Sequence, residues 1–96
     1  MGKACILKTN GTIEALDHQP SYAEAVKIVG GYIEYAPAGK GKTLFCNEEG
    51  LLERLPFNAQ ATKLYNEGNP ANTAFMGKST LVGNVILLEG WRGTKS

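Results

Sequence analysis

The chain has 96 residues, with 10 lysines and arginines against 9 aspartates and glutamates, so its formal charge is +1. A charge this balanced provides no bulk attraction to nucleic acid or to a membrane surface, and no window approaches the roughly 20 apolar residues that cross a bilayer. We expect a cytoplasmic protein with one domain over residues 1–96, of which 90–96 form a flexible tail. Such a short chain buries only about 60–65% of the surface exposed on unfolding, and a homo-oligomer would supplement its core.

The first third of the chain predicts a hairpin followed by a helix. Residues 4–9 and 12–16 alternate apolar and polar side chains around Asn10-Gly11, which is typical of a tight hairpin turn. Ser21 and Glu24 have the spacing of a capping box that starts a helix, and Gly30-Gly31 ends it. The residues expected on its buried face are Tyr22, Ala25, Val26 and Val29.

Strands predicted at 32–35 and 42–47 are joined by a glycine-rich loop at 37–41, which we interpret as a second hairpin. The tripeptide Gly41-Lys42-Thr43 matches the end of a phosphate-binding loop, but that motif needs a helix directly after it. β-Branched and aromatic residues follow instead and predict a strand. We therefore favour a hairpin loop with solvated lysines, Lys40 and Lys42.

The third quarter of the chain is less regular. Residues 47–50 predict a turn. The segment Leu51–Leu55 is compatible with a short strand or a helical turn that Pro56 ends, and we favour a short extended piece. Asn58 is expected to cap a second helix that runs through Tyr65 and ends before Gly68. The residues expected to face inward from it are Ala61, Leu64 and Tyr65.

The last quarter predicts a loop and a central strand. Residues 69–79 are rich in Asn, Pro, Ala, Gly and Ser, which favours a loop. Residues 81–88 predict a continuous apolar strand at the centre of the sheet, with a bulge at Gly83. Together the elements predict a single α+β domain, with a mostly antiparallel sheet of about five strands and two short helices packed on it.

Few patterns in the chain point to catalysis. Glu48 and Glu49, with Glu34 nearby, suit acid–base or metal chemistry, but neighbours in a turn point apart and no His or Asp completes a metal set. His18 is the one histidine and has no nucleophile motif near it, so we interpret it as a solvated loop residue. We expect no enzyme, no metal and no cofactor. The cysteines are expected as free thiols in strands, at Cys5 and Cys46.

Three spaced motifs give the chain a family resemblance. They are Gly31-Tyr32-Ile33-Glu34, then Asn47-Glu48-Glu49-Gly50-Leu51, then Leu55-Pro56 with Asn58. Their order resembles an uncharacterised family of small proteins, a domain of unknown function, from phages, plasmids and integrated elements. The resemblance covers nearly the whole chain, which departs from it in the 69–80 loop and the tail around Trp91.

The resemblance implies a phage-type accessory protein that acts in the host cytoplasm by binding, with no catalytic residues to transfer. Its most concrete form is an anti-defence sponge that sequesters a cyclic nucleotide immune signal. The alternative is an inhibitor that binds a host or defence protein, which predicts an exposed apolar patch. A small enzyme is the least favoured function, and neither nucleic acid nor a membrane is expected as a partner.

A nucleotide site needs aromatic rings to stack a base, amides to read its edge, and cations for phosphate. The residues that we assign to such a site are Tyr32, Lys42, Asn47, Arg54, Asn58, Tyr65, Asn69, Trp91 and Arg92. The chain also offers the rings of Tyr35, Phe57 and Phe75, the amides of Asn66 and Asn72, and the cations of Lys63 and Lys78. For any one aromatic residue, burial or a subunit contact is favoured over base stacking.

Overall fold

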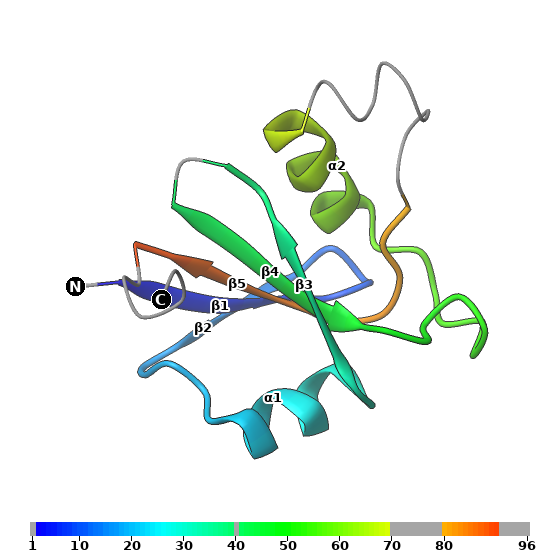
Figure 1. Cartoon of the computed structure of the whole chain (residues 1–96), viewed down its shortest axis with the longest axis horizontal. Helices are drawn as coiled ribbons and strands as arrows, with labels where there is room; N and C mark the ends of the chain where they lie inside the picture. Colours follow the sequence, from blue (N-terminus) through cyan, green and yellow to red (C-terminus); the bar gives the residue numbers. More distant parts are fainter. Residues whose placement is uncertain (1, 40, 70–79, 91–96) are drawn as a thin grey trace.

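The computed structural model describes residues 2–39, 41–69 and 80–90 (Figure 1). Its strands are β1 Lys3–Leu7, β2 Ile13–Leu16, β3 Ile33–Pro37, β4 Lys42–Asn47 and β5 Val85–Glu89. In this part of the chain they form a 5-stranded sheet in the order β2-β1-β5-β4-β3, with every neighbouring pair antiparallel. The predicted α+β fold and the central position of the last strand are confirmed.

Two helices, α1 (Tyr22–Val29) and α2 (Ala59–Gly68), lie on opposite faces of the sheet (Figure 1). The core under α1 consists of Ala4, Ala25, Val29, Phe45, Ile86 and Leu88. The core under α2 consists of Leu7, Ala36, Ala38, Leu44, Cys46, Ala61, Val85 and Leu87. Strand β5 supplies both cores with alternate side chains, which explains why its sequence is apolar throughout.

The local signals at the two helix starts are confirmed. The Ser21 hydroxyl accepts a hydrogen bond from the Glu24 backbone amide at 3.2 Å, and the Glu24 carboxylate accepts one from the Ser21 amide at 2.8 Å. Helix α1 ends at Gly30, as predicted, and α2 has Asn58 as its N-cap. The predicted burial of Tyr22 is wrong, because the buried residues of α1 are Ala25 and Val29 and Tyr22 is 63% exposed.

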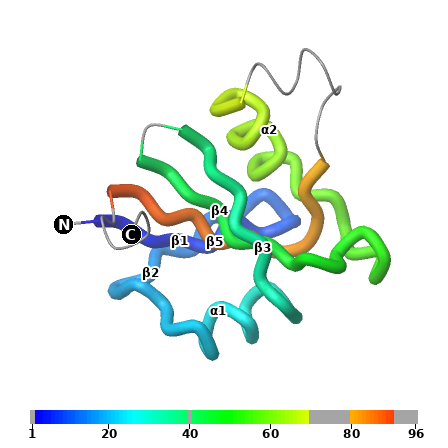
Figure 2. The backbone as a smooth tube through the Cα atoms, viewed as in Figure 1, coloured from blue at the N-terminus to red at the C-terminus, as the bar shows by residue number. Residues whose placement is uncertain are grey.

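The extended piece predicted at Leu51–Leu55 is wrong. After β4 the chain leaves the sheet and forms a set of turns before it enters α2 (Figure 2). Backbone hydrogen bonds close these turns, from Glu53 to the Glu49 carbonyl at 2.9 Å and from Leu55 to the Gly50 carbonyl at 3.1 Å. The amides of Glu53, Arg54 and Leu55 are therefore paired within the turns, without a neighbouring strand.

The single strand predicted over 81–88 is also wrong in its first half. Gly83 has a φ of +76°, a left-handed conformation that breaks the strand, and β5 begins only at Val85. Upstream of this break, Val82 forms an isolated antiparallel bridge with Phe57. The chain thus changes partner at Gly83, from the segment that precedes α2 to the central sheet. Most of the loop predicted at 69–79 and of the tail predicted at 90–96 lies outside the described residues.

Candidate functional site

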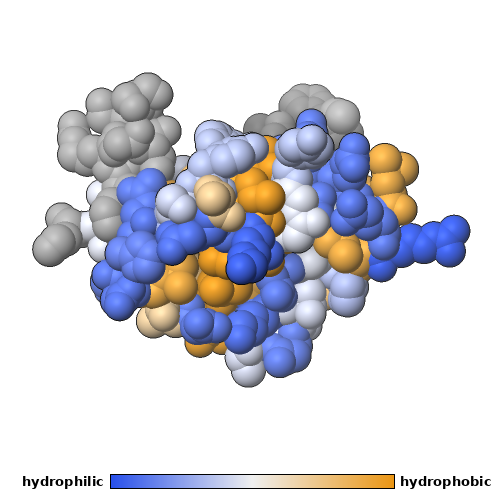
Figure 3. Space-filling model, turned by 90° about the horizontal axis from the view of Figure 1, so that it is seen from below, coloured by the Kyte–Doolittle hydropathy of each residue, from blue (hydrophilic) through white to orange (hydrophobic). Residues whose placement is uncertain are grey.

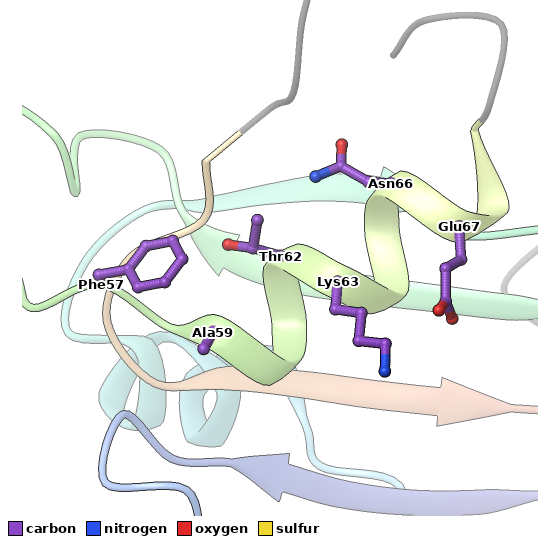
Figure 4. A pocket seen from close by; sticks show the side chains of 6 residues that line it. All are labelled: Phe57, Ala59, Thr62, Lys63, Asn66 and Glu67. Atoms are coloured by element: carbon purple, nitrogen blue, oxygen red, sulfur yellow. The ribbon is translucent and has the colours of Figure 1, made fainter.

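A groove of about 450 Å³ runs along the outer side of α2. The described residues that line it are Phe57, Ala59, Thr62, Lys63, Asn66 and Glu67. The five helical members follow the spacing of one stripe of an α-helix, turned away from the core residue Ala61. Figure 4 shows the Phe57 ring beside the start of this stripe, with the Asn66 amide extending along the helix in the direction of Thr62.

Asn58 fixes the position of the groove. Its side chain is fully buried, and its Oδ1 accepts a hydrogen bond from the Ala61 amide at 3.0 Å. Its Nδ2 donates to the carbonyls of Leu7 and Gly83, both at 2.8 Å. One residue therefore ties the start of α2 to strand β1 and to the break before β5. Because Phe57 directly precedes Asn58, this anchor also holds the aromatic ring at the mouth of the groove.

Thr62 makes a second anchor within the lining. Its hydroxyl donates to the Leu81 carbonyl at 3.2 Å and accepts from the Leu81 amide at 2.8 Å. This hydroxyl is therefore committed to the fold. Polar contact with a ligand would come first from the exposed ammonium of Lys63, and the half-buried side chain of Asn66 also lines the groove. Glu67 adds a negative charge one turn beyond Lys63, which limits how many phosphates the groove can accept.

None of the seven described residues among the nine assigned from the sequence lines this groove. Asn47 and Asn58 have structural roles: both are buried, and their amides bond to the chain itself. Asn69 donates to the carbonyls of Pro37 at 2.8 Å and Tyr65 at 2.9 Å, and Tyr65 packs against the core under α2. The structure thus places these four polar side chains within the fold.

The remaining assigned residues are dispersed. Tyr32 is 68% exposed just before β3, Lys42 begins β4, and Arg54 lies in the turns after β4. Trp91 and Arg92 lie outside the described residues. The groove residues Phe57, Asn66 and Lys63 carry one weak signal in the sequence, an aromatic residue directly before a helix cap followed by helically spaced polar residues.

The Gly41-Lys42-Thr43 tripeptide is part of a hairpin. The Lys42 amide donates to the Gly39 carbonyl at 3.0 Å, and the Lys42 carbonyl accepts from the Ala38 amide at 3.0 Å. Strand β4 begins at Lys42, within the tripeptide, so the helix that a phosphate-binding loop requires does not follow it. The interpretation of this segment as a hairpin loop is confirmed.

Comparison with known protein families shows which family the chain belongs to. The family model described as Domain of unknown function (DUF3846) matches residues 3–95. The chain belongs to the DUF3846 family. The comparisons with curated proteins and with solved structures returned no match. The DUF3846 match covers the five strands, both helices and the groove beside α2, so the groove lies inside the family's domain.

On the α1 side of this DUF3846 domain, hydrophobic surface lies between hydrophilic borders (Figure 3). A hollow of about 310 Å³ on this domain is lined by Leu16, His18, Pro20, Glu24, Lys27 and Ile28. His18 is exposed, and its Nδ1 lies 2.6 Å from Asp17 Oδ1 and its Nε2 3.2 Å from Glu24 Oε1. The hydrogen bonds to Asp17 and then to Glu24 raise the pKa of His18.

Within the described residues, no group of three or more His, Cys, Asp and Glu side chains is arranged to hold a metal ion.

Both cysteines of the DUF3846 domain are free thiols in strands, as predicted. Burial, with a smaller contribution from Glu34, raises the pKa of Cys46 to about 11, and burial raises that of Cys5. A thiol with such a pKa stays protonated near neutral pH and is a poor nucleophile. Neither helix within residues 2–39, 41–69 and 80–90 has the length and apolar character of a membrane span.

Proposed function

We propose that this protein is a non-catalytic binding protein that sequesters a small nucleotide in the groove beside α2. The observation that carries the proposal is the meeting of Phe57, Lys63 and Asn66 at one groove. These three side chains supply one aromatic ring, one cation and one amide. They are the groups that stack a base, neutralise a phosphate and read a base edge.

The geometry of the groove supports a ligand with one aromatic base and few phosphates. The Phe57 side chain is 54% exposed, so a base can stack on its ring without any rearrangement of the core. Lys63 and Glu67 lie one helical turn apart and nearly balance each other in charge. A cyclic nucleotide, which carries one charge per phosphodiester, fits this balance better than a nucleoside triphosphate does.

The lining also supports retention of the ligand without chemical change. Among the described residues of the lining none is a Ser, Cys or His nucleophile, and the hydroxyl of Thr62 is bonded to Leu81 at both donor and acceptor, which leaves the Glu67 carboxylate as the acid–base group there. The finer proposal, an anti-defence sponge for a cyclic nucleotide signal in a phage-infected host, is supported by the resemblance described above. In this proposal the protein is a symmetric homo-oligomer that works in the cytoplasm.

Calorimetry against a panel of cyclic dinucleotides, cyclic trinucleotides and cyclic ADP-ribose isomers tests the proposal. We expect one class to bind, and Phe57→Ala to weaken that binding by about tenfold, the usual effect of removing one stacked ring. Lys63→Gln is expected to weaken binding and Glu67→Gln to strengthen it, because they remove charges of opposite sign beside the phosphate. Tyr22→Ala and Lys27→Gln are matched controls on α1, across the sheet from the groove.

Ligand recovered after heat denaturation separates the possible functions. A sponge returns the ligand intact, whereas an enzyme returns it altered. Absence of binding across the whole panel would refute the nucleotide proposal and favour an inhibitor that binds a host protein. Sedimentation of the purified protein tests the proposed homo-oligomer, which a monomer at micromolar concentration would contradict.

A further inference from the structure

The turns that follow β4 present two leucines to solvent. Leu51 is 68% exposed and Leu52 is 82% exposed, and they are adjacent in the chain. Figure 1 shows this segment projecting from the end of β4, beyond the ends of both helices. Adjacent exposed leucines at a projecting tip are a feature of interaction surfaces, since they lose apolar exposure only when a partner covers them.

The leucine tip is held in place by several hydrogen bonds. Buried Asn47 accepts at Oδ1 from the Glu49 amide at 2.8 Å and donates from Nδ2 to the Glu53 carboxylate at 3.1 Å. The same Nδ2 donates to the Val29 carbonyl at 3.2 Å and so ties the turns to the end of α1. The exposure of the leucines is therefore built into the fold. A surface that is already ordered loses little conformational entropy on binding.

The base of the tip is packed as tightly. Gly50 is buried, and a Cβ placed on it would lie 2.7 Å from Val82 Cγ2. On the far side of the tip, Leu55 packs closely against Gly83. A Cβ placed on Gly83 would lie 2.8 Å from Leu55 Cδ1. Close packing therefore restrains the backbone on both sides of the two leucines.

The border of the tip is acidic. Glu48, Glu49 and Glu53 are exposed around the leucines, and Arg54 is the one cation, so residues 48–54 carry a charge of −2. An anionic membrane surface repels such a border. The charge instead complements an apolar protein surface edged by lysines or arginines.

We propose that the Leu51–Leu52 tip is a protein-docking surface whose partner is an apolar helix face or groove bordered by Lys and Arg. This surface is separate from the nucleotide groove, because none of the residues that line the groove belongs to the tip. A protein that binds both partners would link ligand capture to a host protein. Because the tip and the groove share no residues, a variant of one surface leaves the other intact.

Amide NMR titrations with three short helical peptides test the docking surface. One peptide has a leucine face edged by lysines, the second a leucine face edged by glutamates, and the third a serine face edged by lysines. We expect only the Leu/Lys peptide to bind and to shift the amides of residues 48–55. In the double variant Leu51→Ser/Leu52→Ser, this binding should weaken by about tenfold or more, because two apolar side chains are lost. Ile13→Ser removes an aliphatic side chain that is 61% exposed on β2 and is the matched control.

Other outcomes overturn the proposal. No binding of the Leu/Lys peptide, shifts outside residues 48–55, or equal binding of the Ser/Lys peptide would each reject it. So would a double variant that binds within about twofold of the wild type. Leucine-dependent binding to vesicles of anionic phospholipid would assign the tip to a membrane instead. Peptide binding that persists in Phe57→Ala shows that the result does not depend on the nucleotide groove.

Discussion

Replacement of Asn58 by alanine should destabilise this protein far more than loss of an ordinary helix cap does. The side chain is fully buried and makes three hydrogen bonds, one to the helix and two to carbonyls of distant segments. Loss of the cap alone costs about 1 kcal/mol. Each buried carbonyl deprived of its donor adds about 1–3 kcal/mol. We take the lower end, since a carbonyl can keep a second donor, and expect a loss of about 3 kcal/mol.

The matched control is the other helix cap, Ser21. It caps α1 from an exposed position through a single side-chain bond to the Glu24 amide. Ser21→Ala should therefore cost only about 1 kcal/mol. Asn58→Asp keeps the cap acceptor but sets a buried carboxyl group against the carbonyls of Leu7 and Gly83, so it should destabilise at least as much as Asn58→Ala.

Urea unfolding followed by circular dichroism measures these differences as shifts in the free energy of unfolding. We expect the order of destabilisation to be Asn58→Asp and Asn58→Ala well above Ser21→Ala. A loss of about 3 kcal/mol is a large part of the total stability of a domain of this size, so the Asn58 variants are best measured at low temperature. If Asn58→Ala cost no more than Ser21→Ala, the anchoring role of Asn58 would be refuted.

His18, Gly83 and Cys46 give further predictions. His18, whose pKa is raised by Asp17 and Glu24, should titrate by NMR above its ordinary value of about 6.5 and return toward it in Asp17→Asn; an unchanged midpoint would contradict the contacts. Because the folded pKa is raised, the stabilisation by His18 should be complete below the unfolded pKa and lost as pH rises through the folded value, so His18→Ala should destabilise at pH 5.5 more than at pH 8.5. Gly83→Ala should lower the free energy of unfolding more than Gly41→Ala does. Both residues have a φ of +76°, but only at Gly83 would the new Cβ meet a side chain, 2.8 Å away. Equal losses of stability in urea melts would argue against this packing. Cys46 should react with a disulfide reagent at pH 8 only as fast as the protein unfolds, whereas rapid labelling of the native state would contradict its burial and its pKa of about 11.

The parts of the fold that the sequence predicted correctly are those set by neighbouring residues. The capping box of Ser21 and Glu24 and the cap at Asn58 involve contacts three residues apart, so pattern alone locates both helix starts. The central strand was recognised because β5 is buried on both faces.

The errors fall where distant contacts decide the backbone. The turns at 51–54 depend on Asn47, which bonds to Val29 eighteen positions earlier. The break at Gly83 depends on a carbonyl bonded to Asn58, twenty-five positions earlier. Neither contact leaves a periodic signal in the local sequence.

The groove also depends on contacts between distant residues, so the local sequence does not predict it. Asn58 was assigned to a ligand from its residue type, but its amide holds β1, the break at Gly83 and α2 together. That assembly is what positions Phe57 at the start of the α2 groove, and it requires a contact between residues 7 and 58, fifty-one positions apart. Residue type alone therefore does not show which of the aromatic, amide and cationic side chains lie together at a site.

Intermolecular nuclear Overhauser effects between ligand and protein test the central claim most directly. The measurement uses the tightest-binding cyclic nucleotide and protein with labelled aromatic rings. The account predicts contacts between base protons and the Phe57 ring, together with shifts of the Lys63 and Asn66 amides. Contacts from the base to Tyr32 or Tyr35 instead, or a bound nucleotide that leaves the α2 groove unperturbed, would contradict it.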